Sequence, residues 1–197
     1  MKISPTWVRE FVDLKVDDSR LAEDLTLTGT AVESVGADGV FEMEITTNRP
    51  DCMNHYGVAR ECSAVYDAAL KPIQPRLPGE QGKANFSIEI ADAGGCARYT
   101  ARIVRGVKVA ASPKGVADRL ASVEQRAINN VADASNYTLW EMGHPTHAFD
   151  LDLLQGGKIV VRRARAGETL KTLDGVERKL SPDDLVIADA QRPVALA

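Results

Sequence analysis

Residues 129–150 read NNVADASNYTLWEMGHPTHAFD, and this stretch decides how the second half of the chain folds. Residues 130–142 lack proline and glycine, and Gly143 follows them directly. Glycine is the usual residue just past the end of a helix, because it tolerates the left-handed backbone conformation found there. The stretch therefore predicts a helix over residues 130–142 and an irregular segment after it.

The same stretch holds the best candidates for chemistry. Ser135, Asn136 and His147 supply a hydroxyl, an amide and an imidazole, which can donate and accept hydrogen bonds to a small polar ligand or a water. Ala148 is small enough to allow a ligand to approach closely. Two structural alternatives stay open: the Ser-Asn pair as a helix cap, and His147 as a half-buried histidine beside Phe149.

Outward from this stretch, a change of composition divides the chain. Residues 71–82, KPIQPRLPGEQG, contain three prolines and two glycines and cannot continue a helix or a central strand. We expect a linker over residues 75–83 between a first module, 1–74, and a second module, 84–197.

Each module mixes helical and strand patterns. In the first we expect helices after Ser4-Pro5 and after Asp18, a strand over 40–46 and a helix over 51–69. In the second we expect a helix after Ser112-Pro113, a hairpin around Asp174-Gly175, and strands over 86–90, 98–109, 158–164 and 185–188. This order indicates an α+β fold with a mixed sheet rather than a doubly wound one.

Composition excludes several classes of protein. The chain has 197 residues, of which 44% are hydrophobic and 26% charged, as in ordinary globular proteins. It has neither the roughly 18-residue apolar run of a membrane helix nor a signal-peptide pattern, which favours the cytoplasm. Three scattered cysteines, Cys52, Cys62 and Cys96, indicate free thiols and no metal site. The usual motifs of serine hydrolases, P-loops and zinc proteases do not occur, and no cofactor is expected.

The net charge of −4 argues against a surface coated in basic residues. Residues 75–197 are nevertheless slightly basic, while residues 1–74 are acidic. Four arginines fall on predicted strands and are candidates for RNA contact: Arg98, Arg102, Arg162 and Arg163. They would bind phosphates without reading sequence, and the alternative is a solvated strand face.

Three blocks of sequence resemble one known family, the bacterial phenylalanyl-tRNA synthetase beta subunit. The first comprises MKIS with Trp7, LTLTG at 25–29, and Val32-Glu33. The second comprises EITTNRPDC at 44–52 and GVARE at 57–61. The third runs from INNV at 128–131 through SNY at 135–137 and HAFD at 147–150 to VRRA, TLDGVER and DLVIA at 161–188. The blocks stand in family order along nearly the whole chain.

The resemblance implies a fold and an activity. Residues 1–74 would be a B1-like α+β module, and residues 84–197 a B3/B4 module, a three-layer α/β unit with an unusual β-sandwich. In the family, that second module hydrolyses tyrosine wrongly attached to tRNA(Phe). Activation of phenylalanine with ATP and Mg²⁺ belongs to the alpha subunit, and the working enzyme is an (αβ)₂ heterotetramer that binds tRNA(Phe).

The editing residues of the family map onto Ser135, Asn136, His147 and Ala148. Three departures accompany the match. Only residues 36–39 stand where the family usually inserts an OB-fold tRNA-binding domain. Serine replaces the usual threonine at 135, and His144 and Thr146 replace glutamine and methionine. The chain also stops before a glycine-rich segment and a glutamate of the pocket.

These departures leave three hypotheses. The first is part of a synthetase beta subunit that supports aminoacylation and editing, with a truncated editing module that is weak by itself. The second is a non-catalytic scaffold that contacts the alpha subunit or RNA. The third is a stand-alone hydrolase that edits mischarged tRNA in trans.

Overall fold

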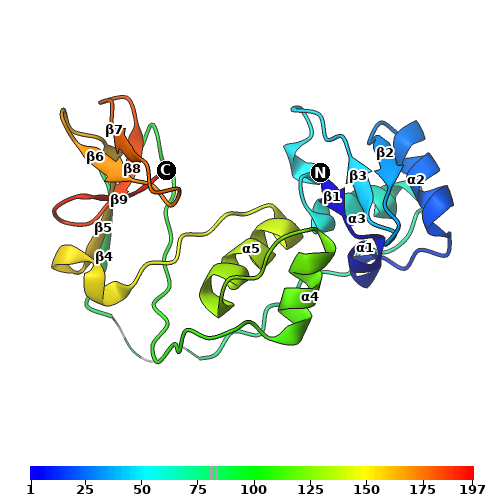
Figure 1. Cartoon of the computed structure of the whole chain (residues 1–197), viewed down its shortest axis with the longest axis horizontal. Coiled ribbons are helices and arrows are strands. Elements are labelled where there is room, and N and C mark those ends of the chain that lie inside the picture. Colours follow the sequence, from blue (N-terminus) through cyan, green and yellow to red (C-terminus); the bar gives the residue numbers. More distant parts are fainter. Residues whose placement is uncertain (80–81, 83) are drawn as a thin grey trace. The chain divides into compact units, whose positions relative to one another are not determined.

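The structure, a computed structural model, describes residues 1–79, 82 and 84–197. Contacts divide the chain into two compact units (Figure 1). The first unit combines Met1–Leu77 with Lys108–Ala148, and the second combines Pro78–Val107 with Phe149–Ala197. Of the predicted linker 75–83, residues 80, 81 and 83 lie outside the described part of the chain.

The first unit begins with a small sheet and three helices. In chain order these are β1 Lys2–Ile3, α1 Pro5–Phe11, α2 Asp18–Leu27, β2 Val32–Val35, β3 Phe41–Met43, the 3-10 turn η1 Pro50–Cys52, and α3 His55–Val65. The antiparallel sheet has the order β1-β3-β2, so β3 is central, and Phe41 pairs with Ile3 on one side and Val35 on the other. The short connection expected at residues 36–39 is a tight turn, in which Gly36 N–H donates to Val40 O at 2.8 Å.

Polar caps set where these helices begin. Ser4 caps α1, as predicted, with its Oγ accepting from Trp7 N–H at 3.4 Å. The third helix starts later than the predicted residue 51, because Asn54 is its cap and accepts from Gly57 N–H at 2.7 Å. Met53, which falls inside the predicted helix, lies before this cap and is 42% exposed.

The core of the first unit is formed by apolar side chains from all of these elements. Its buried members are Ile3, Val8, Val12, Leu14, Leu21, Leu25, Phe41, Met43, Cys52, Val58, Ala59 and Cys62. Burial raises the pKa of the Cys62 thiol to about 12 and that of Cys52 to about 11, so both stay protonated. These two cysteines are free thiols, as predicted, and they pack in this core.

Two further helices complete the first unit. They are α4 Lys114–Ser122 and α5 Asn130–Met142, and the bounds of α5 match the prediction. Asn129 caps α5 by accepting from Val131 and Ala132 N–H at 3.0 Å each. Gly143 ends the helix with φ +71°, a conformation that disfavours side chains.

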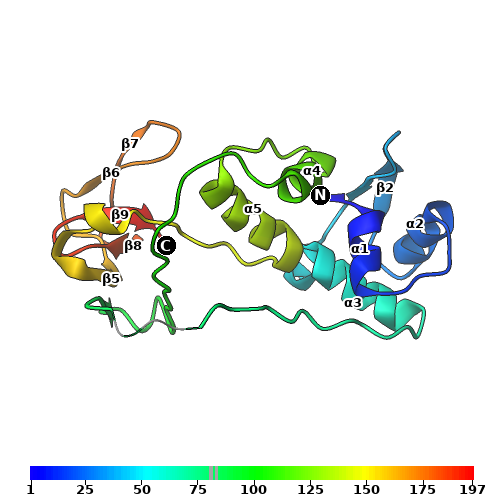
Figure 2. The same cartoon turned by 90° about the horizontal axis from the view of Figure 1, so that it is seen from below.

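These helices group differently from the predicted modules. The expected boundaries placed residues 108–148 in the second module, whereas contacts assign them to the first unit. Figure 2 shows α4 and α5 beside α1 and α3. The physical reason is a set of buried polar and aromatic contacts that a boundary drawn from composition cannot reveal.

His55 lies at the centre of these contacts. Its Nε2 accepts from the backbone N–H of Ser4 at 3.0 Å, and its Nδ1 donates to the carbonyl oxygen of Trp140 at 2.7 Å. The ring is fully buried and stacks on Trp7 with centroids 4.0 Å apart. Both hydrogen bonds require the neutral imidazole with its proton on Nδ1, and burial lowers the pKa of His55 to about 4.

A second group of side chains extends this junction. The Arg119 guanidinium on α4 lies 5.4 Å from the Trp7 ring centroid and 5.5 Å from that of Tyr137. It also forms an ion pair with Glu10 at 2.5 Å. Trp7 Nε1–H donates to Glu141 on α5 at 3.2 Å. The contacts of Trp7 therefore bind α4 and α5 to α1.

The second unit is built on strands. Its four-stranded sheet has the order β4-β5-β8-β9, where β4 is Ser87–Ile90, β5 Lys158–Arg163, β8 Leu185–Ala188 and β9 Pro193–Leu196. Only β4 and β5 are parallel, so the sheet is mixed as expected. The predicted hairpin forms from β6 Thr169–Lys171 and β7 Glu177–Lys179. The 3-10 turns η2 Leu151–Leu153 and η3 Gln155–Gly157 precede β5.

The α+β class is confirmed, but one predicted strand is wrong. Residues 98–109 have no strand assignment, although their alternating pattern favours one. A strand needs a hydrogen-bonded neighbour, and β4, β5, β8 and β9 pair with one another in the described part of the chain. Val104 and Val109 are accordingly 68% and 70% exposed.

Replacing His55 with alanine tests the junction. We expect the free energy of unfolding at pH 7 to fall by about 3–5 kcal/mol, since a buried ring is lost and two backbone groups lose their partners. Below pH 6.5 the unfolded wild-type chain binds a proton that the folded chain excludes, so stability falls as pH falls. Between pH 6.5 and pH 4 the free energy of unfolding of the wild-type chain falls by about 3 kcal/mol for this reason. The His55→Ala variant does not show this fall, because it lacks the titrating ring.

Urea unfolding between pH 4 and pH 7, followed by tryptophan fluorescence, measures both effects. His144→Ala is the matched control, because His144 is exposed. The control should follow wild type at every pH. A constant difference in stability between wild type and His55→Ala from pH 7 to pH 4 would contradict a neutral buried imidazole.

Candidate functional site

Ser135 joins α5 to the segment that follows the helix. Its Oγ donates to the carbonyl oxygen of Thr146 at 2.9 Å and accepts from Thr146 Oγ1–H at 2.7 Å. The turn at Gly143 reverses the chain, and these two bonds hold the returning segment against the helix. His147 follows Thr146 directly, so the backbone of His147 lies close to the part of α5 that carries Ser135.

The other candidate residues surround this contact. Asn136 is the next residue on α5 and is half-buried, while His147 and Ala148 are exposed. Exposure excludes the alternative of a half-buried His147. The alternative role of Ser135 as a helix cap is also wrong, because the cap is Asn129 and Ser135 lies in the interior of the helix. His144 is also exposed.

The hydrogen bonds of Ser135 limit what it can do chemically. A serine nucleophile needs a base that accepts its proton, and the acceptor of the Ser135 hydroxyl is a backbone carbonyl. The Ser135 hydroxyl is therefore suited to positioning the segment and a ligand rather than to covalent catalysis. His147 is the ionisable side chain among the four candidates, and it is exposed.

The neighbouring face of α5 was missed by the sequence analysis. Tyr137 and Glu141 are four residues apart, so they lie on the same side of the helix. Both interact with Arg119, which donates to the Tyr137 hydroxyl and lies 3.8 Å from Glu141. Burial and the Glu141 carboxylate raise the pKa of Tyr137, which stays protonated. The spacing of this pair was a usable signal only that the two side chains lie side by side on the helix.

The four candidate arginines divide into two kinds. Arg98 and Arg102 are exposed on a segment without strand structure. Arg162 is buried, and its guanidinium donates to both carboxylate oxygens of Glu168 at 2.7 and 2.8 Å. That pairing lowers the pKa of Glu168 to about 2. Arg163 forms an ion pair with Asp92 at 2.5 Å.

The ion pairs of Arg162 and Arg163 make these two arginines less available to RNA than Arg98 and Arg102. The Arg162 charge is balanced inside the second unit, so the alternative of a solvated strand face does not apply to it. Contact with RNA by the four arginines stays a prediction, and Arg98 and Arg102 are the two with exposed side chains and no internal ion pair in the described residues.

One group of possible metal ligands was not expected. Asp51, Cys52 and Glu61 hold their ligand atoms within 4.8 Å of one another. The Arg49 guanidinium contacts all three, at 3.0 Å, 2.9 Å and 2.5 Å respectively. It holds the pKa of Asp51 well below its usual range. A fixed cation therefore already supplies the positive charge that this group requires, and the cluster is an ion-pair network.

No helix in the described residues has the length and apolar character needed to cross a membrane.

Known proteins are similar to this chain over most of its length. A family model described as the B3/4 domain matches residues 95–197. The phenylalanine–tRNA ligase beta subunit of Moorella thermoacetica is 47% identical over 181 residues, which are 90% of this chain and 22% of that protein. That of Geobacter metallireducens is 45% identical over 182 residues, 90% of this chain and 22% of that protein. The chain thus spans about a fifth of these relatives.

Replacing Ser135 with alanine tests the contact between α5 and the segment after it. We expect hydrogen exchange of the backbone amides of residues 146–148 to become several-fold faster, because hydrogen bonds worth about 1 kcal/mol each are lost. Mass spectrometry after proteolysis measures this rate.

Thr138→Ala is the control, since the Thr138 hydroxyl donates only within the helix, to Ala134 O at 2.9 Å. It should leave exchange in residues 146–148 unchanged. Equal exchange in wild type and Ser135→Ala would show that the two hydroxyls do not hold the segment.

Proposed function

The chain belongs to the B3/4 domain family, and on that premise we propose that it forms part of a phenylalanine–tRNA ligase beta subunit and hydrolyses Tyr-tRNA(Phe). The observation that carries this proposal is 47% identity over 181 residues to a protein of that name. The candidate residues Ser135, Asn136, His147 and Ala148 lie inside the region matched by the B3/4 family model. The position of His147 supports it further, since its backbone lies close to the part of α5 that carries Ser135.

The chemistry explains why such a site is useful. A synthetic site shaped for phenylalanine cannot strongly reject tyrosine, which differs only by an added hydroxyl. A second pocket with polar groups that need that hydroxyl rejects phenylalanine, because a missing partner leaves those groups unpaired. Hydrolysis at the second pocket then removes the error.

The reaction needs a water and no covalent intermediate. The water oxygen attacks the ester carbonyl carbon, the bond from that carbon to the ribose oxygen breaks, and the proton passes to the ribose oxygen. The products are free tyrosine and uncharged tRNA(Phe). We assign to His147 a hydrogen bond to the water or to the ester, while Asn136 contacts the amino acid or the terminal ribose and Ala148 leaves room for them. Ser135 holds the segment that carries His147.

The rest of the proposal rests on the names of the relatives and on what the resemblance to the synthetase family implies. A beta subunit implies an alpha subunit, and we propose an (αβ)₂ assembly in the cytoplasm that binds tRNA(Phe). Ligation itself would need ATP and Mg²⁺, which we assign to the alpha subunit. A non-catalytic scaffold is the second candidate, favoured by the first unit, in which α4 and α5 pack with the N-terminal elements into one compact body.

Release of tyrosine from Tyr-tRNA(Phe) tests the proposal. The protein is the 197-residue chain, and also this chain placed in the Moorella thermoacetica beta subunit instead of the matching segment. We expect the chimaera to hydrolyse the ester much faster than the chain alone. In the chimaera, His147→Ala should lower the rate at least about tenfold, within the range expected for loss of a general acid–base or orienting group.

His144→Ala is the matched control, because it removes an exposed imidazole three positions away. It should leave the rate within about twofold of wild type, as expected for a surface substitution away from the reacting groups. Equal rates for wild type and His147→Ala would remove His147 from the site. A chimaera that releases tyrosine no faster than buffer would overturn hydrolysis and favour the scaffold.

A further inference from the structure

The hairpin formed by β6 and β7 has one face that points away from the protein. Its register pairs Thr169 with Lys179, Leu170 with Arg178, and Lys171 with Glu177. Paired residues lie on the same side of a sheet, and sides alternate along each strand. Leu170 packs against the cluster of Ala164, Leu180, Val186 and Ala188. Lys171 and Lys179 are therefore together on the opposite face, which is exposed.

These two lysines differ from four other cations of the second unit, which form ion pairs. Lys158 pairs with Glu89, Arg162 with Glu168, Arg163 with Asp92 and Arg178 with Asp174. Among the described residues, Lys171 and Lys179 have no carboxylate within ion-pair distance. The carboxylate opposite Lys171 belongs to Glu177, which instead accepts from Thr169 Oγ1–H at 3.0 Å.

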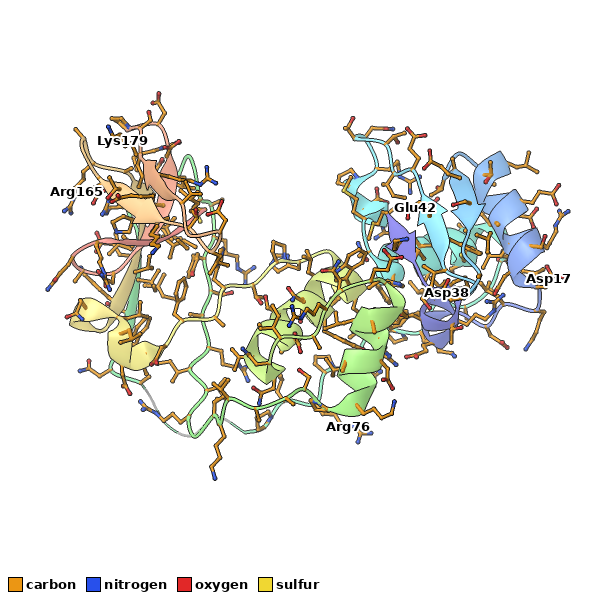
Figure 3. All side chains as sticks on the ribbon, viewed as in Figure 1. Asp17, Asp38, Glu42, Arg76, Arg165 and Lys179 are labelled. Carbon is orange, nitrogen blue, oxygen red and sulfur yellow. The ribbon has the colours of Figure 1, made fainter. Side chains whose placement is uncertain are left out.

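A third cation lies in the turn that leads into this hairpin. Arg165 is exposed in the turn between β5 and β6, and Figure 3 shows Arg165 and Lys179 at the periphery of this unit. The backbone N–H of Arg165 donates to Glu168 at 2.7 Å, while the Glu168 carboxylate is already held by Arg162. The Arg165 charge is therefore only partly balanced within the unit.

We propose that the face of the β6–β7 hairpin with Lys171 and Lys179, together with Arg165 in the preceding turn, binds the backbone phosphates of RNA. The inference rests on the proposed function, which supplies tRNA as the nucleic acid. Two lysines diagonal to each other across a two-stranded sheet are roughly 7–8 Å apart at their Cα atoms, and their flexible stems reach separate phosphates. Such contacts fix position and carry no sequence information.

The net charge of the whole chain makes RNA binding depend on where its cations gather. With a net charge of −4, the chain as a whole does not attract RNA, so binding depends on local groups of unbalanced cations. Each phosphate contact adds about 0.7–0.9 to the slope of log affinity against log salt concentration. Two lysines therefore account for close to two in that slope.

The test is binding of a fluorescent tRNA(Phe) transcript to the 197-residue chain between 50 and 200 mM KCl, followed by anisotropy. The variant is Lys171→Gln with Lys179→Gln, since a glutamate at 171 would face Glu177 and weaken the hairpin. We expect at least about fivefold weaker binding at 100 mM salt and a slope reduced by about two.

Lys15→Gln with Lys114→Gln is the matched control. Both residues are exposed lysines of the first unit, paired with Asp13 and Asp118, and their replacement changes the net charge equally. The control should bind within about twofold of wild type and keep its slope, because exposed cations that are already paired add little. Thermal melting of both double variants verifies that each is folded.

Three outcomes would overturn the inference: equal loss in variant and control, an unchanged slope in the variant, or tighter binding of polyglutamate than of tRNA. The last result would assign the face to an acidic protein.

Affinity is measured without hydrolysis, so the two proposals fail separately. A chain that binds tRNA through the lysines but releases no tyrosine refutes only the hydrolytic function, and a chain that edits with unaltered binding in the variant refutes only this surface.

Discussion

The neutral imidazole of His55 is the interaction on which the first unit depends. Its two ring nitrogens connect the backbone of Ser4, before α1, to the backbone of Trp140, near the end of α5. A charged ring could not accept from the Ser4 amide, so the unit is assembled only with the proton on Nδ1. Because α5 carries Ser135 and Asn136, the placement of the candidate site depends on a residue far from it in sequence.

The second unit uses charge differently from the first. Its cations on β5 form ion pairs within the unit, and the pair of Arg162 with Glu168 is the most buried of these. Breaking a buried pair leaves an uncompensated charge, which is strongly destabilising. Among the described residues, the hairpin lysines Lys171 and Lys179 form no ion pair. The paired cations therefore stabilise the unit, while these two lysines are available to a partner.

Local patterns predicted much of this fold. Helix α5 and the hairpin of β6 and β7 formed as expected, since a cap, a glycine and an Asp-Gly turn act over a few residues. Residues 98–109 failed as a strand because pairing depends on a distant neighbour. The candidate residues came from resemblance, and their roles stay predictions. His55, Arg119 and the covered face of α5 went unseen, because each has a partner far away in sequence: Trp140 for His55, Glu10 for Arg119 and Trp7 for Glu141 of α5.

The most direct measurement of the central claim is a nitrogen NMR titration of the His55 ring in the 197-residue chain. The structure predicts a neutral ring protonated on Nδ1 throughout the range from pH 7 to pH 5, with a pKa of about 4. A ring protonated on Nε2, or one that titrates near the ordinary histidine value of about 6.5, would contradict it.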